Sequence, residues 1–361
     1  MCIRDRAGIL SSILKSTGVS NAFLMLFINM GIDVRFFPLI VFIICCLVST
    51  SIGTSTGTIS MAVPIFLPLT TIINCNPALI LGAIVCGSFF GDNLSPISDT
   101  TIISINTMKV ELYETLKQRA KISLICFGLS CIVYIILGYY FIPNNTIVLE
   151  YNYSLSPLVM MLTFIIMAIL LIKKKDIISV LLVCDMAAIV IAVLFGFINI
   201  EELLCSNSCI VTGIEGVFGV IIFWIFLFIL TGFIPEETLE NIANKNLKSE
   251  KKSNFLGIAI IILSVLMVAN NTAAMSLISK FINKCFKNKT QIEKANIFDG
   301  LSCAVPGLLP YNTAFMLMIS MAYDTGCISQ NFSVFLILLF SVNSIFLLIF
   351  YIILALSLIH I

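Results

Sequence analysis

The sequence predicts an all-α polytopic membrane protein with inverted-topology repeats, each combining a re-entrant hairpin with a discontinuous transmembrane helix. Hydrophobic residues make up 60% of the chain and charged residues 11%, with a mean hydropathy of +1.12. This composition belongs to a membrane protein rather than to a soluble domain. Lysines gather in short connectors, and polar side chains interrupt apolar runs in both the first and the last third. The net charge of +1 gives no indication of nucleic-acid binding.

The first repeat is expected over residues 7–121 and begins with a hairpin over about 36–73. An apolar run leads to Gly53 and Gly57, which we place at the hairpin tip. Hydroxyl side chains surround these glycines: Ser51, Thr54, Ser55, Thr56 and Thr58. Irregular backbone at membrane depth is tolerated where it lines a cavity, which favours a polar tip. Helix packing by the Ser and Thr side chains is the alternative.

A broken helix over about 77–108 follows, and its centre is the stretch GSFFGDNLSPISDTTIIS. Asp92 and Asp99 lie in this stretch on either side of Pro96, which removes a helical donor. An acid in the hydrocarbon region costs several kcal/mol unless it faces a cavity or a partner, so both are functional candidates. An ordinary turn is the alternative. The close apolar flanks and the lack of Lys or Arg favour a site.

The middle of the chain is expected to hold a charged connector and four scaffold spans within residues 122–234. The spans are 122–142, 155–172, 176–198 and 214–234. Connectors bearing Lys or Arg alternate with loops that lack both, and the positive-inside rule places the former in the cytoplasm: 109–121, 173–175 and 236–254. Asp185 lies in the third span, where it could join a proton path or reach the interface.

The second repeat is expected over residues 235–354. Its hairpin, over about 255–282, is interrupted by polar residues from Asn270 to Thr272. Its broken helix covers about 295–321, and a final span covers 331–354. Four crossings separate the two hairpins, so they enter from opposite faces, as inverted repeats do.

Both chain ends are expected to be foreign. Residues 1–6 (MCIRDR) and 355–361 resemble translated sequencing adapters, which would make His360 an artefact. The thirteen cysteines show no paired CxxC spacing, so neither zinc nor a disulfide framework is favoured.

Three motifs carry a resemblance to a known family: GTSTGTISMAVPI (53–65), GSFFGDNLSPISDTT (87–101) and AxxxDGLSCAVPGLLPYNT (295–313). With them the chain resembles the NhaC family of sodium/proton antiporters. The resemblance implies a secondary active transporter of the cell membrane that exchanges Na⁺ for H⁺ and is no enzyme. It implies an ion site formed by Asp92, Asp99, Ser95, Ser98 and Thr100, with Na⁺ on the two acids, facing a tip with Thr54, Ser55 and Thr58. The second repeat would contribute Asn271, Asp299 and Asn312.

Sodium is a hard cation that prefers oxygen ligands, which carboxylates, hydroxyls and freed carbonyls supply. Two ionised acids at ~6 Å with an effective dielectric of ~20 repel by roughly 3 kcal/mol, so a proton can compete with Na⁺. The expected partners are Na⁺, H⁺ and the lipid bilayer, with no cofactor and no nucleic acid. The sequence leaves open whether the protein forms a homodimer.

Two other functions are compatible with parts of the sequence. The first is exchange of an organic acid such as malate or lactate, coupled to Na⁺ and H⁺. It would need positive partners such as half-helix N-termini or a buried Arg. No Lys or Arg lies inside the two broken segments, which favours a cation, although helix ends alone could suffice. The second, more remote, is an intramembrane aspartic protease with two acids sharing a proton. That mechanism gives no role to the tip hydroxyls.

Overall fold

The computed structural model describes residues 33–143, 156–173, 177–198, 250–329 and 332–357, with the single positions 13, 17 and 229. Every regular element within these residues is helical. Among the described residues, five segments are long and apolar enough to cross a membrane: Val34–Ile52, Ser55–Ile72, Pro77–Met108, Leu112–Phe141 and Gln291–Asp324. The expected all-α polytopic membrane protein is confirmed at this level.

The first polar break separates helices α3 (Phe37–Ile52) and α4 (Ser55–Phe66). The short 3₁₀ helix η1 (Val34–Phe36) precedes them, and α5 (Leu69–Ile72) follows. Helix α3 ends at Gly53, whose φ of +77° is the left-handed conformation that glycine adopts without strain. Gly57 lies inside α4, so its expected place at the tip is wrong. The break consists of Gly53 and Thr54 alone.

The second break separates α6 (Pro77–Leu94) from α7 (Asp99–Met108). Asn76 caps α6 by accepting a hydrogen bond from the Ala78 amide at 2.9 Å. Residues 95–98 are not helical, and Pro96 lies among them. Because proline cannot donate a backbone hydrogen bond, the chain leaves α6 here and begins a new helix three residues later.

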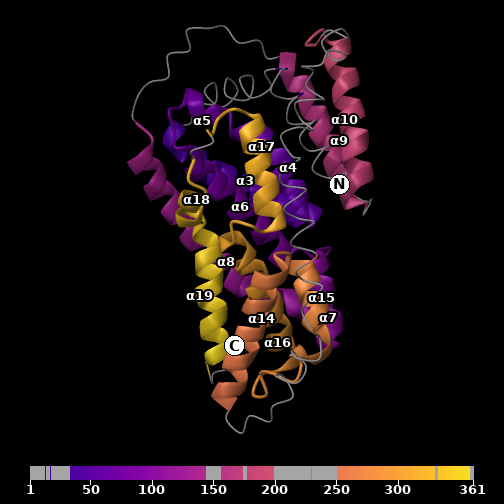
Figure 1. Cartoon of the computed structure of the whole chain (residues 1–361), viewed down its shortest axis with the longest axis vertical. Helices are drawn as coiled ribbons and strands as arrows, with labels where there is room; N and C mark the ends of the chain where they lie inside the picture. Colours follow the sequence, from indigo (N-terminus) through magenta and orange to yellow (C-terminus); the bar gives the residue numbers. More distant parts are fainter. Residues whose placement is uncertain are drawn as a thin grey trace.

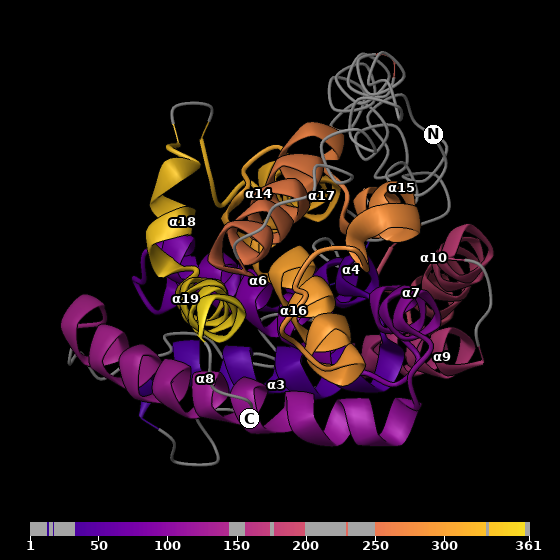
Figure 2. The ribbon, with the colours of Figure 1, turned by 90° about the horizontal axis from the view of Figure 1, so that it is seen from below.

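Helix α8 (Leu112–Phe141) corrects the expected connector at 109–121, because most of that charged stretch is helical and continuous with the next span. Its exposed face is apolar and includes Leu124 and Ile132. Its buried face carries Arg119 and Ser123. Polar side chains inside and apolar side chains outside are what a helix in lipid requires. Figure 2 shows α8 extended along one side of the molecule, beside α3.

The short helix η2 (Ser156–Met160) leads into α9 (Met161–Ile172) and α10 (Ile177–Leu194), which pack against each other (Figure 1). The expected span 214–234, apart from residue 229, and the expected loop up to residue 249 lie outside the described residues. Of the two chain ends expected to be foreign, residues 1–6 and 358–361 also lie outside the described residues.

The last third forms α14 (Glu250–Val268), α15 (Asn271–Ile282), α16 (Gln291–Ala304), η3 (Pro306–Leu308), α17 (Thr313–Asp324), α18 (Phe335–Phe340) and α19 (Val342–Leu356). A capping box between Thr290 and Glu293 starts α16. The break between α14 and α15 is Ala269–Asn270, and Ala269 has a φ of +53°. The expected final span is divided at Ser341 into α18 and α19.

The two halves of the chain exchange helices. Helix α7 packs against α15 and α16, whereas α17 packs against α4. Figure 1 shows α7 in the lower half beside α15, and α17 in the upper half with α3 and α4. Each broken helix therefore starts in its own half and ends in the other.

Candidate ion site at the helix breaks

A cavity of about 420 Å³ lies where the helix breaks meet. Most of the residues in its wall are Ser, Thr, Asn or Asp, and they come from both halves of the chain. It is lined by Gly53, Thr54, Ser55, Thr56, Asp92, Ser98, Asp99, Thr100, Asn270, Asn271, Thr272, Ala273 and Thr313. In a chain this apolar, such a cavity is the default binding-site hypothesis.

Four helices begin at this cavity. The first residues of α4, α7, α15 and α17 all belong to its wall: Ser55, Asp99, Asn271 and Thr313. The first turn of a helix leaves backbone N–H groups without an internal partner, and the helix dipole adds partial positive charge there. The ends of these four helices therefore stabilise negative charge in the cavity.

Asp92 is the buried acid of this cavity, with only 5% of its surface exposed. It lies in the last turn of α6, and the Asn271 amide donates to its Oδ2 at 3.5 Å. The hydroxyl and backbone amide of Ser55 also face its carboxylate. These contacts bring the starts of α4 and α15 onto one carboxylate.

Asp99 differs from Asp92 although both line the cavity. Asp99 is exposed and is the first residue of α7. The break at Pro96 places the second acid at the start of a new helix rather than two turns along the same one. The repulsion expected between two desolvated acids therefore does not apply to this pair.

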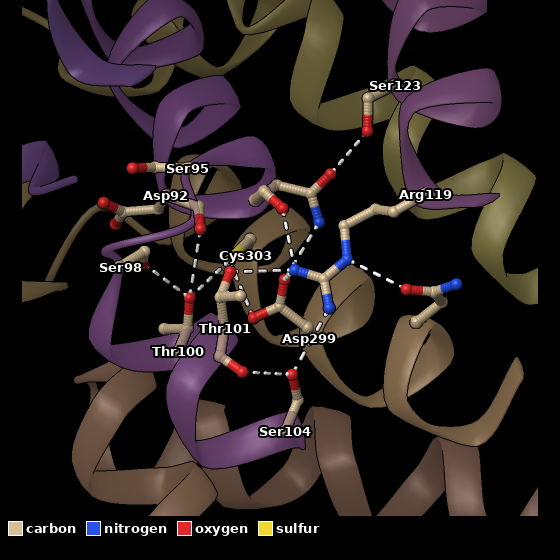
Figure 3. Close-up of polar contacts among 12 residues, drawn as sticks. Asp92, Ser95, Ser98, Thr100, Thr101, Ser104, Arg119, Ser123, Asp299 and Cys303 are labelled. Atoms are coloured by element: carbon tan, nitrogen blue, oxygen red, sulfur yellow. Dashed lines mark hydrogen bonds and ion pairs between the residues drawn. The ribbon is translucent and has the colours of Figure 1, made fainter. Parts of the chain in front are cut away.

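A second polar cluster lies beside the cavity and is centred on an ion pair. Arg119 of α8 and Asp299 of α16 meet at 2.5 Å between Nη1 and Oδ2, and both side chains are fully buried. Asn93 donates through Nδ2 to the same Asp299 oxygen at 3.3 Å, and it accepts a 2.6 Å bond from the Ser123 hydroxyl. Figure 3 shows the Asp92 carboxylate pointing away from this ion pair.

Each of the three guanidinium nitrogens of Arg119 has an acceptor, so its charge is bound within the protein. The acceptors are Asn296 Oδ1 at 3.0 Å for Nε, the Asn93 carbonyl and Thr101 Oγ1 at 2.9 Å each for Nη1, and Ser104 Oγ at 3.3 Å for Nη2. The acceptors come from α6, α7 and α16, while the arginine comes from α8. The side chain thereby joins four helices.

The two broken segments contain no Lys or Arg, but the buried Arg119 reaches the polar cluster beside the cavity from α8. Arg119 lies in the stretch 109–121, which the sequence predicts as a connector, whereas the structure shows that residues from Leu112 onward belong to α8. A stripe along α8 could have revealed it: Thr115, Arg119, Ser123, Cys126, Ser130, Tyr134 and Gly138 recur at three or four residues and are all buried. This spacing places them on one helix face.

The remaining residues suggested by the resemblance divide into two groups. Thr54, Ser98 and Thr100 line the cavity, and Thr100 Oγ1 donates to the Asp92 carbonyl at 3.1 Å. Ser95 is buried outside the lining. Two others also lie outside it: Thr58 donates to the Thr54 carbonyl, and Asn312 caps α17 and donates to the Ala269 carbonyl.

Comparison with known proteins gives partial matches. Residues 7–141 match the Na⁺/H⁺ antiporter family. The malate-2H⁺/Na⁺-lactate antiporter of Bacillus subtilis is 25% identical over 47% of this chain and 38% of its own length. An uncharacterized Na⁺/H⁺ antiporter of Haemophilus influenzae is 34% identical over 44% of this chain and 36% of its own length.

The Na⁺/H⁺ antiporter NhaC of Alkalihalophilus pseudofirmus is 29% identical over 30% of this chain and 23% of its own length. The chain thus spans less than two fifths of the length of each of these relatives. The motif GSFFGDNLSPISDTT, with Asp92 and Asp99, lies within the matched residues. Residues 7–141 of this membrane protein are thus similar to the Na⁺/H⁺ antiporter family, which is a family of transporters.

Proposed function

We propose that this protein exchanges Na⁺ for H⁺ across the cell membrane and that Asp92 holds the transported ion. The observation that carries the proposal is the charge environment of Asp92. This buried carboxylate faces the cavity and forms no ion pair with a described Lys or Arg. Asp299, by contrast, is paired with Arg119. Asp92 is therefore the buried acid whose charge is available to a mobile cation.

The cavity offers oxygen ligands that suit sodium. The hydroxyls of Ser55, Ser98 and Thr100 lie on its wall with the Asp92 carboxylate. Sodium is a hard cation and binds such oxygens, as Ca²⁺ and Mg²⁺ do. A proton on the carboxylate removes the charge that holds Na⁺, so either ion excludes the other. Exclusive occupancy is the condition for coupled exchange.

Alternating access is proposed to come from two inverted repeats, one containing α3–α7 and the other α14–α17. Each has two helices around a short break followed by a broken helix. The exchange of α7 and α17 between the halves supports this assignment, because each half then supplies a wall of the same cavity. Movement of one repeat against the other would expose Asp92 to one side and then to the other.

A second substrate class has its own support in the helix ends. Four helix N-termini at one cavity favour an anion, and 420 Å³ exceeds the space that a bare sodium ion needs. The Bacillus subtilis relative is a malate-2H⁺/Na⁺-lactate antiporter by name. Because Arg119 is fully engaged, these helix ends would be the positive partners of a carboxylate substrate. Exchange of a small organic acid with Na⁺ and H⁺ is therefore the alternative.

The decisive experiment uses everted membrane vesicles from cells that express the gene encoding this chain. We expect Na⁺ to dissipate a preformed pH gradient and Asp92→Asn to abolish this response while the protein remains inserted. Asp33→Asn is the matched control, because Asp33 is exposed and caps η1, and asparagine caps equally well. It should leave exchange unchanged.

Asp99→Asn should raise the Na⁺ concentration that exchange requires, because its exposed carboxylate lies on the cavity wall. A response to malate or lactate without one to Na⁺ alone would select the organic-acid alternative. Full Na⁺ exchange by Asp92→Asn would refute the proposed site.

A further inference from the structure

We infer that Arg119 determines the cation selectivity of the site by cancelling the charge of Asp299, so that the buried charges at and beside the cavity sum to −1. This inference rests on the proposed cation exchange at Asp92. It assigns a positioning and charge-setting role to a side chain of α8, which contributes no residue to the cavity wall.

Asp299 lies close to the cavity, although it does not line it. Thr100, which does line the cavity, has its Oγ1 at 3.6 Å from the Cys303 sulfur. The Cys303 sulfur in turn lies 3.9 Å from Asp299 Oδ1. Figure 3 shows Thr100 and Cys303 between Asp92 and Asp299. Asp299 is therefore one layer of side chains away from the proposed ion.

The charge count follows from these positions. The buried charged side chains of the two adjoining clusters are Asp92, Asp299 and Arg119, and their formal charges sum to −1. Asp99 also lines the cavity, but it is exposed and therefore not one of these buried charges. One uncompensated buried negative charge matches a monovalent cation. Without the guanidinium, two carboxylates would share a desolvated region with several hydroxyls, and the sum would be −2. Such an oxygen-rich dianionic site is what Ca²⁺ or Mn²⁺ prefers.

Substitutions can vary the charge while keeping polar side chains in place. Arg119→Gln changes the sum of the buried formal charges to −2, and Asp299→Asn changes it to 0. The double variant returns this sum to −1. Arg119→Lys keeps the charge but loses the planar group that reaches acceptors in α6, α7 and α16. It is the matched control for the hydrogen-bond network.

The test measures Na⁺-triggered dissipation of a pH gradient in everted vesicles, with and without added Ca²⁺. Asp299→Asn should require at least about tenfold more Na⁺, a factor that corresponds to 1.4 kcal/mol. Arg119→Gln should be inhibited by Ca²⁺ at concentrations that do not affect the unmodified protein. The double variant should regain Na⁺ exchange and lose the Ca²⁺ sensitivity. Arg119→Lys should stay insensitive to Ca²⁺ even if exchange slows.

A purely structural role for Arg119 gives a different result. The double variant would then be at least as impaired as the worse single variant, and Ca²⁺ would not affect Arg119→Gln; that result overturns the inference. If the double variant fails to insert, the Ca²⁺ response of Arg119→Gln decides.

Failure of the proposed function itself would appear separately, as no Na⁺ response in the unmodified protein. Ca²⁺ binding by purified Arg119→Gln, measured as a rise in its thermal unfolding midpoint, then tests the charge count alone. No rise would overturn it.

Discussion

The two broken helices have similar designs and place their acids in different electrostatic environments. In the first, Asp92 lies near the end of α6, before the break at 95–98; in the second, Asp299 lies near the end of α16, before the break at 305–312. Asp92 faces the cavity, whereas Asp299 meets Arg119 at 2.5 Å. The neighbouring helix α8, and not the break itself, determines which acid is held in an ion pair.

The largest expected contrast concerns stability when each acid becomes an amide. Asp299→Asn leaves the Arg119 guanidinium buried without its counter-charge, and removing one member of a buried ion pair costs about 3–5 kcal/mol. Asp92→Asn removes an unpaired charge from a desolvated place and keeps a polar group near Asn271. It should cost less than about 1 kcal/mol or be stabilising. The thermal unfolding midpoint of the purified proteins in detergent measures both.

The double substitution Arg119→Gln with Asp299→Asn supplies the control for this contrast, because it removes both buried charges together. It should recover part of the stability lost in Asp299→Asn. Equal destabilisation by Asp92→Asn and Asp299→Asn would contradict the view that only Asp299 depends on an ion pair for its stability.

The sequence predicts the breaks better than it predicts their surroundings. Pro96 and the polar residues around it locate the end of α6, because a proline lacks a backbone donor and disfavours helical backbone at the residue before it. Proline alone is not sufficient for a break, since Pro64 lies inside α4. The interruption near Asn270 likewise falls beside the observed break at 269–270. These features depend on local backbone chemistry, which neighbouring residues determine.

Arg119 could not be placed from local chemistry alone. The stretch KVELYETLKQRAK is charged enough to resemble a connector, and only its helical continuation into an apolar span shows that one face is buried. Local chemistry also does not predict that Asp92 is buried and Asp99 exposed. Seven residues would place both on one face of an unbroken helix, but the break moves Asp99 to the exposed start of α7. Both properties depend on tertiary contacts.

The second contrast concerns the glycine near each break. A Cβ on Gly91 would overlap both the side chain and the backbone of Ser49 on α3. A Cβ on Gly307 would overlap the Ser344 hydroxyl and lie 2.9 Å from its Cβ. Since a hydroxyl can rotate and a helix backbone cannot, Gly91→Ala should cost about 2–3 kcal/mol and Gly307→Ala about 1 kcal/mol. Thermal unfolding midpoints report the difference.

A rescue experiment checks the cause of the smaller effect. Ser344→Ala removes the hydroxyl that a Cβ at Gly307 would meet, so it should restore most of the stability lost in Gly307→Ala. No comparable side-chain change should rescue Gly91→Ala, because the backbone of Ser49 also obstructs its Cβ. Rescue of Gly91→Ala by Ser49→Ala would contradict this account.

The smallest contrast concerns how α7 and α17 begin. Asn312 caps α17 by accepting the Ala314 amide at 2.9 Å, whereas Ser98 makes no side-chain capping bond to α7 and instead lies 3.0 Å from the Thr100 hydroxyl. Asn312→Ala should therefore lower stability by about 1 kcal/mol, and Ser98→Ala by about 0.5 kcal/mol. For transport, we expect Ser98→Ala to have the larger effect of the two. Ser98 lines the cavity and Asn312 does not, so Ser98→Ala should raise the Na⁺ concentration needed for exchange more than Asn312→Ala.

Asn312→Asp is the matched control, because aspartate also caps a helix start and should keep most of the stability. Unfolding midpoints in detergent rank the variants by stability, and Na⁺ titrations in everted vesicles rank them independently by the Na⁺ concentration that exchange requires. If Asn312→Ala impaired Na⁺ exchange more than Ser98→Ala, the second break would take part in ion binding. The unequal roles of the two breaks would then be wrong. If Asn312→Ala has the larger effect on stability and Ser98→Ala the larger effect on Na⁺ exchange, the first break supplies ion ligands. The second break then supplies the rigid start of α17, which helps to hold those ligands in place.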